Sequence, residues 1–147
     1  MKRDSKAGMS LPLLVVVCLT FAAPSLLAAQ TSGLSCSGAQ RPRLVAELLF
    51  GRNIGRRIGV GESAWSRFVA RELTPRFPGG LTVTDAVGQW RDPASGETVR
   101  EPTKKVEIVM PGNADDQERL ATVVKAYKSE FRQRSVGVIV RTACVAF

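Results

Sequence analysis

The order in which apolar residues change their spacing along the chain constrains its fold more than any other feature. The strand-like alternation, in which every second residue shares a face, is found in residues 43–50, 81–90, 98–110 and 136–145. Two other stretches have apolar residues at helical spacing: Trp65, Phe68, Val69 and Leu73, and then Leu120, Val123, Val124, Tyr127 and Phe131. The predicted order is therefore strand, helix, strand, strand, helix, strand.

This order predicts a ferredoxin-like βαββαβ fold of the α+β class, with a four-stranded antiparallel sheet and both helices on one face. Right-handed crossovers leave few other topologies. Residues 92–96 form the turn signal of the central hairpin, and Asn113 is the expected N-cap of the second helix. Residues 51–61, which contain four glycines and three arginines, are expected to be a loop.

The first 29 residues predict a secretory signal peptide. Lys2, Arg3 and Lys6 give a basic start, an apolar run follows at residues 11–27, and small residues end at Ala29. A retained membrane anchor is the alternative, because the apolar run is of borderline length, but Pro24 and the small residues favour cleavage. We therefore expect a periplasmic or secreted protein that meets the membrane only through this leader.

Cleavage would change both the charge and the cysteine count. It lowers the formal net charge from +8 to +6 and removes Cys18, so that only Cys36 and Cys144 remain. They are either two buried free thiols or one disulfide. The predicted fold favours the disulfide, because the start of the first strand and the end of the last strand meet at one end of the sheet. Residues 30–42 are predicted to be a flexible tether, and residues 43–147 a single domain.

The chain contains no histidine, which excludes several kinds of site. A Ser-His-Asp triad, a Cys-His pair and an imidazole metal site are all ruled out. The widely spaced cysteines form no zinc motif, so no metal is predicted. The glycine motif at residues 59–64 does not directly follow a predicted strand, so we expect no dinucleotide or other cofactor.

The predicted topology gathers basic residues at the end of the sheet opposite the cysteines. This rim contains Arg52, Arg56, Arg57, Arg91, Arg100, Lys104, Arg132 and Arg134. The first helix begins on the same rim and offers free backbone N–H groups. Together these groups suit an anion, although a solvated basic surface is the alternative.

The sheet face away from the helices is the second candidate surface. Alternation places Val106, Ile108, Met110 and Val136, Val138, Val140 toward the helices. It places outward the charged residues Glu47, Lys105, Glu107 and Arg141, beside the apolar residues Val45, Leu49, Val109 and Ile139, with Trp90 as a further candidate for this face. We interpret this face as a homodimer interface rather than a ligand floor. Its two glutamates either form a carboxylate pair in which the pKa of one is raised, or form ion pairs with Lys105 and Arg141. Because the strands lack an aromatic-rich pattern, no nucleic-acid partner is expected.

Several blocks of the sequence resemble an uncharacterised bacterial family, domain of unknown function 3574. The matching blocks are residues 47–52, 65–68, 74–83, 88–91, 100–104 and 144–147. The resemblance covers about residues 36–147 and implies a small exported protein without an established activity. It also directs attention to the polar matches around the central hairpin, which are Gln89, Trp90, Arg91, Arg100, Glu101 and Lys104.

These observations predict an exported, dimeric binding or interaction domain without a metal. We expect an anionic small molecule or envelope component to bind at Arg52, Arg56, Arg57, Gln89, Trp90, Arg91, Arg100, Glu101 and Lys104. The alternative is a small enzyme of the dimeric α+β barrel type, in which Trp90 walls a pocket and Glu101, Lys104 or Arg91 performs the chemistry.

Overall fold

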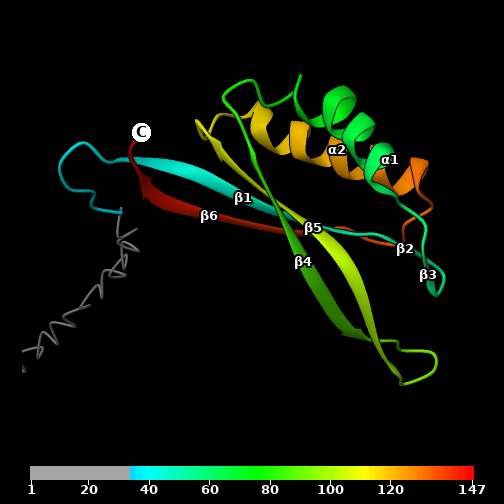
Figure 1. Cartoon of the computed structure of the whole chain (residues 1–147). Coiled ribbons are helices and arrows are strands. Elements are labelled where there is room, and N and C mark those ends of the chain that lie inside the picture. Colours follow the sequence, from blue (N-terminus) through cyan, green and yellow to red (C-terminus); the bar gives the residue numbers. More distant parts are fainter. Residues whose placement is uncertain (1–33) are drawn as a thin grey trace, which may run out of the picture. The chain divides into compact units, whose positions relative to one another are not determined.

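A computed structural model describes residues 34–147 of the chain, so the predicted signal peptide lies outside the described residues. The elements follow one another as β1 (Arg41–Gly51), β2 (Asn53–Ile54), β3 (Arg57–Ile58), α1 (Glu62–Phe68), η1 (Val69–Leu73), β4 (Thr82–Arg91), β5 (Thr98–Met110), α2 (Asp115–Glu130) and β6 (Gly137–Val145) (Figure 1).

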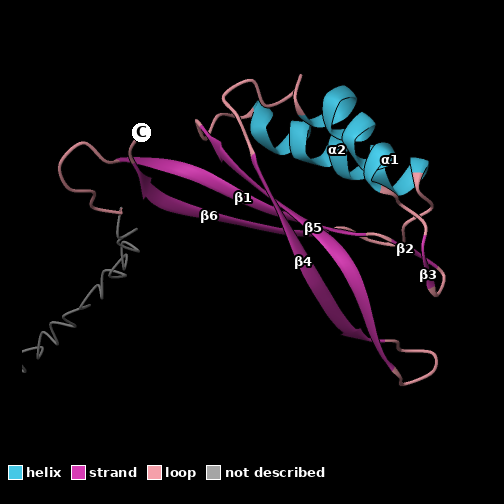
Figure 2. Cartoon of the chain, in the orientation of Figure 1, coloured by secondary structure: helices cyan, strands magenta, loops and turns pink. Residues whose placement is uncertain are grey.

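The main sheet has the strand order β4-β5-β1-β6, and every neighbouring pair is antiparallel. The helices lie on one face of this sheet (Figure 2). The predicted ferredoxin-like α+β fold is therefore confirmed. The strand ends differ slightly from the prediction. β1 begins at Arg41 rather than at residue 43, and β6 begins at Gly137 rather than at residue 136.

An aromatic cluster fills the space between the helices and the sheet. Phe50 of β1 packs against Trp65, Phe68 and Tyr127, with ring centroids between 4.7 and 6.0 Å apart, and Phe131 completes the cluster. All five side chains are buried. The apolar residues found at helical spacing in the sequence are therefore the ones that hold both helices on the sheet. They do so by burying apolar surface.

The central hairpin extends beyond the four-stranded part of the sheet (Figure 1). The pairing of β6 starts with Gly137 opposite Leu49, and the pairing of β1 with β5 ends with Gly51 opposite Thr103. Residues 86–103 therefore form a largely two-stranded projection, here called the hairpin arm. Val87 on the arm is 76% exposed, because no helix covers it.

The segment predicted as a loop at residues 51–61 contains a short hairpin. Its strands β2 and β3 pair around Gly55, which has a φ of +66° that a residue without a Cβ adopts at little cost. The first helical segment ends in a single π turn at η1, where Thr74 N–H bonds to the Val69 carbonyl. Neither feature was predicted, because both depend on local backbone geometry rather than on apolar spacing.

Two further details correct the sequence-based expectations. Asn113 is not the N-cap of α2; Ala114 occupies that position, and the buried Asp116 carboxylate accepts the N–H groups of Gly112 and Asn113 at 2.7 and 2.9 Å. Val138 pairs with the buried Leu48 and so shares its face, yet Val138 remains 44% exposed at the sheet edge.

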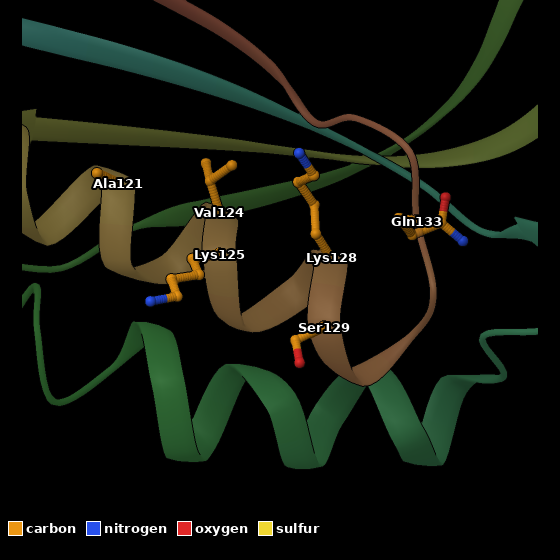
Figure 3. A pocket seen from close by; sticks show the side chains of 6 residues that line it. All are labelled: Ala121, Val124, Lys125, Lys128, Ser129 and Gln133. Atoms are coloured by element: carbon orange, nitrogen blue, oxygen red, sulfur yellow. The ribbon is translucent and has the colours of Figure 1, made fainter.

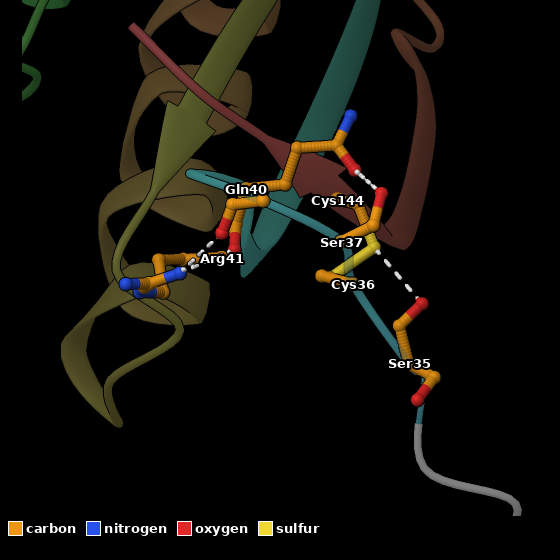
Figure 4. Close-up of a disulfide and its surroundings, with 7 residues drawn as sticks. Ser35, Cys36, Ser37, Gln40, Arg41 and Cys144 are labelled. Carbon is orange, nitrogen blue, oxygen red and sulfur yellow. Dashed lines mark hydrogen bonds between the residues drawn. A yellow bond between two sulfur atoms is a disulfide. The ribbon is translucent and has the colours of Figure 1, made fainter.

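A disulfide joins Cys36 to Cys144 (Figure 4), at the end of the sheet opposite the hairpin arm (Figure 1). The two Cα atoms are 5.4 Å apart, and Cys144 lies in β6 opposite Pro42 of β1. The predicted pairing is therefore confirmed. A disulfide of this kind indicates a non-reducing compartment.

Candidate functional site

Arg52 and Lys104 hold the base of the hairpin arm to the start of α1. Arg52 is buried, donates through Nε to the Val60 carbonyl at 2.8 Å, and contacts the Glu62 carboxylate at 2.7 Å. The Lys104 ammonium, also buried, lies 3.1 Å from Glu62 and 2.5 Å from Asp85. Both cations are therefore already neutralised inside the domain.

The electrostatics of this cluster follow from its hydrogen bonds. The bond to Asp85 raises the pKa of Lys104, and burial opposes that shift only in part. The bond from Lys104 likewise lowers the pKa of Glu62, with Arg52 contributing further. Lys104 and Glu62 therefore both remain charged at neutral pH, which suits a structural clamp better than a proton donor.

Four exposed arginines lie on the helix-side face of the hairpin arm and on the neighbouring β2–β3 hairpin. This arginine surface is defined here as Arg56, Arg57, Arg91 and Arg100. Arg56 reaches the arm, with its guanidinium 3.4 Å from Glu97. Arg91 donates to the Gly96 carbonyl at 2.9 Å, next to that glutamate.

Gln89 also belongs to this side of the arm. Its side-chain carbonyl accepts a 3.0 Å hydrogen bond from Arg100, its direct partner across the two strands. Arg132 and Arg134 follow the end of α2 and are exposed. The end of α2 reaches the same region, because Gln133 between them donates to the Asn53 carbonyl at 2.7 Å.

Trp90 and Glu101 lie on the opposite face of the arm. The unbroken register pairs Gly88 with Glu101 and Trp90 with Val99, so these side chains face away from the helices. The Glu101 carboxylate accepts the Asn53 N–H at 3.3 Å. The residues predicted to form one site are therefore divided among the buried clamp, the arginine surface and the outer face.

On the outer face of the four-stranded region, Glu47 forms two ion pairs. Lys105 lies 2.6 Å from its carboxylate, and Arg141 bonds to its other oxygen. Hydrogen bonds, first from Lys105 and then from Arg141, lower the pKa of Glu47. Arg141 also lies 3.6 Å from Glu107. The ion-pair interpretation of this face is therefore the correct one, and a raised carboxylate pKa at Glu47 is wrong.

A shallow groove along α2 was not found from the sequence. It has a volume of about 520 Å³ and lies over one side of α2, with Lys125, Lys128 and Gln133 among its lining residues (Figure 3). A smaller hollow of about 290 Å³ lies on the outer face, between Phe147, Val109 and the Gly79–Gly80 turn. Neither is beside Trp90, where the enzymatic alternative needed a pocket.

Residues 34–147, the part of the chain that the structure describes, lack both a metal-binding cluster and a membrane-spanning helix. It contains no group of three or more His, Cys, Asp or Glu side chains placed to hold a metal ion. No helix in the same part of the chain is long and apolar enough to cross a membrane.

The fold and the arrangement of these surfaces define a small ferredoxin-like α+β domain with a projecting, charged hairpin arm. The chain belongs to the family described as a protein of unknown function (DUF3574), whose model matches residues 45–147. A search of curated proteins finds no match.

Solved structures with the same fold include a phage SAM lyase. In complex with S-methyl-5'-thioadenosine, that enzyme aligns with a TM-score of 0.55 and 17% identity, over 77% of this chain and 95% of its own. Its apo state aligns with a TM-score of 0.51 and 15% identity, over 78% and 97%. CutA from Synechococcus elongatus PCC7942 gives 0.44 and 13%, over 73% and 80%. At these identities the likeness concerns the fold.

Proposed function

We propose that this protein is an exported binding domain whose arginine surface takes an anionic ligand. The observation that carries the proposal is the contact between the two hairpins, in which Arg56 approaches Glu97 at 3.4 Å beside Arg91. This contact brings exposed guanidinium groups from separate elements close together. Guanidinium groups bind phosphate and carboxylate oxygens through paired, charge-assisted hydrogen bonds.

Binding is favoured over catalysis because the groups suggested for an enzyme do not converge. Lys104 is held by Asp85 and Glu62, while Arg91 and Glu101 are on opposite faces of the hairpin arm. The likeness to the phage SAM lyase extends to the fold and is compatible with an enzyme, but it identifies no reacting group here.

The test is thermal unfolding of the protein purified from the periplasm, at low ionic strength, with inorganic phosphate or sulfate added. We expect the melting temperature to rise in a saturable manner, and Arg56→Ala with Arg57→Ala to abolish the rise. Arg43→Ala with Arg67→Ala removes the same charge from exposed positions elsewhere and should retain it. An equal rise in both double variants, or no rise in the wild type, would refute the proposal.

A second arm of the experiment distinguishes a free anion from an envelope component. Vesicles containing phosphatidylglycerol are sedimented with the protein at physiological salt. Co-sedimentation that the Arg56/Arg57 variant loses, without any effect of phosphate, would assign the anion to a lipid headgroup. A phosphate effect without co-sedimentation would assign it to a soluble ligand.

We further propose that two copies associate through the outer face of the four-stranded region. Leu49 and Ile139 there are 36% and 48% exposed, and the charges of Glu47 are already paired within one copy. Covering this face would bury apolar surface with little unpaired charge. Light scattering should give a dimer mass at micromolar concentration, and Ile139→Glu should give a monomer that retains its melting temperature. A wild-type monomer would refute the association.

Export through residues 1–29 is part of the same proposal, and the disulfide supports it. Mass spectrometry of protein from the periplasm should give a chain that begins near residue 30 and contains no free thiol. A chain retaining the leader would favour the membrane-anchored alternative.

A further inference from the structure

One carboxylate on the outer face of the hairpin arm differs from its counterparts. Among residues 34–147, six Asp and Glu residues are buried or partly buried, and four of them have basic partners: Glu47, Glu72, Glu107 and Asp116. The fifth, Asp92, caps its own turn by accepting the Ala94 N–H at 2.8 Å. The sixth, Glu101, has no basic side chain within ion-pairing distance in this described part of the chain.

The Glu101 side chain is recessed into the sheet because a glycine lies on each side of it. A Cβ at Gly51 would lie 2.7 Å from the carboxylate oxygen Oε1, so any larger residue there would displace the carboxylate. On the other side, a Cβ at Gly88 would lie 2.7 Å from the Thr103 hydroxyl. At both positions the constraint comes from the close approach of side chains rather than from an unusual φ.

Only one of the two carboxylate oxygens is bonded within the domain. Oε2 accepts the Asn53 N–H at 3.3 Å, whereas no hydrogen bond from residues 34–147 reaches Oε1. The negative charge of Glu101 also contributes to the raised pKa of the buried Tyr127, after the larger effect of burial. Glu101 is thus a partly buried carboxylate without an ion-pair partner among residues 34–147, in a domain with more basic than acidic residues.

An exposed aromatic ring lies one diagonal step away on the same face. Trp90 is 41% exposed and is paired with Val99, two residues before Glu101 on β5. Diagonal neighbours on one face are about 7–8 Å apart, which is within reach of an aromatic side chain. A carboxylate and an exposed indole on the same sheet face favour organic cations, because both groups attract positive charge.

We propose that Glu101 and Trp90 form a binding site for an organic ammonium group on the outer face of the hairpin arm. The carboxylate neutralises the charge of the ammonium group, and the indole contacts its methyl or methylene groups. The site is separate from the arginine surface, since it uses the other face of the arm. It also lies on the hairpin arm rather than in the four-stranded region proposed to pair two copies.

The test follows the two indole N–H signals in a proton–nitrogen correlation NMR spectrum. Tetramethylammonium chloride is titrated against the oxidised wild-type protein, with sodium chloride at matched ionic strength as the control. We expect saturable movement of the exposed Trp90 signal, with a Kd on the order of 1–10 mM, while the signal of the buried Trp65 stays unchanged. An absence of saturable movement would overturn the proposal.

Three variants distinguish this site from non-specific attraction. Glu101→Gln keeps an oxygen for the Asn53 N–H but removes the charge, and it should weaken tetramethylammonium binding at least about tenfold. Glu107→Gln removes the same charge from the same strand and face and should bind like the wild type. Gly51→Ala, which displaces the carboxylate, should weaken binding without changing the net charge. Equal affinities in the Glu101 and Glu107 variants would refute the assignment, and unchanged melting temperatures would show that both remain folded.

Discussion

Replacing both cysteines of the Cys36–Cys144 pair with serine tests the largest contribution to stability that any single interaction is predicted to make in this fold. The bond closes a loop across a sequence separation of 108 residues, which includes all of the strands but the end of β6. On the chain-entropy model, a loop of this size is worth about 4.7 kcal/mol. With an unfolding entropy of about 2.1 cal/mol/K per residue, that loss lowers the melting temperature by roughly 20 °C.

The measurement is urea unfolding of the oxidised wild type and the Cys36→Ser/Cys144→Ser variant, followed by far-ultraviolet circular dichroism. Extrapolation to zero urea gives the two free energies of unfolding, and the wild type under reducing conditions should match the variant. Thr142→Ser, an exposed change two residues before Cys144, is the control and should alter stability by less than about 0.5 kcal/mol. A difference below about 1 kcal/mol between variant and oxidised wild type would refute the loop-closure reasoning.

Three other predictions concern charges and hydrogen bonds within the domain. The pKa of Glu47 is lowered in the folded state, so its stabilisation is complete above its ordinary pKa of about 4.3 and is lost as the pH falls through the lowered value. Glu47→Gln should therefore make stability less sensitive to acid between about pH 5 and pH 3, and an unchanged pH profile in urea unfolding would contradict this. Asp116→Ala removes the buried acceptor of two N–H groups and should cost about 2–3 kcal/mol in urea unfolding, whereas Asp115→Ala, at an exposed position, should cost less than about 0.5 kcal/mol. Tyr127→Phe removes the 2.9 Å bond from the buried hydroxyl to the Gly51 carbonyl and should cost about 1–2 kcal/mol; a neutral effect would show that the bond contributes nothing.

The topology could be predicted from the sequence because each strand and helix carries its own apolar spacing. Trp65, Phe68 and Leu73 identified the first helical segment, and they are buried in the structure. The disulfide was favoured by the topology, since the start of the first strand and the end of the last strand meet at one end of the sheet. The short β2–β3 hairpin had no comparable signal, because its two strands contain only two residues each.

The candidate site was predicted by position along the sheet but not by face. Alternation suggested Trp90 as a candidate for the outer face, and the same alternation could have placed Lys104 beside Val106 on the helix side and Glu101 on the outer face. The burial of Arg52 carried no such signal, because it depends on Glu62 lying at the start of α1, ten residues later. The spacing of residues along the sequence does not show which hydrogen-bond acceptors the fold will place beside a basic residue.

A single disulfide joins the start of β1 to the end of β6, and this has a mechanical consequence. Cys36 precedes β1, and Cys144 lies one residue before the end of β6. A force that pulls residue 34 away from residue 147 is therefore carried by the sulfur–sulfur bond, and the folded loop between the cysteines bears almost none of it. While the bond is intact, such a force leaves the strands and the hairpin arm unextended. Reduction transfers the load to the terminal β1–β6 hydrogen bonds, so the redox state of one bond decides whether the domain resists tension or extends.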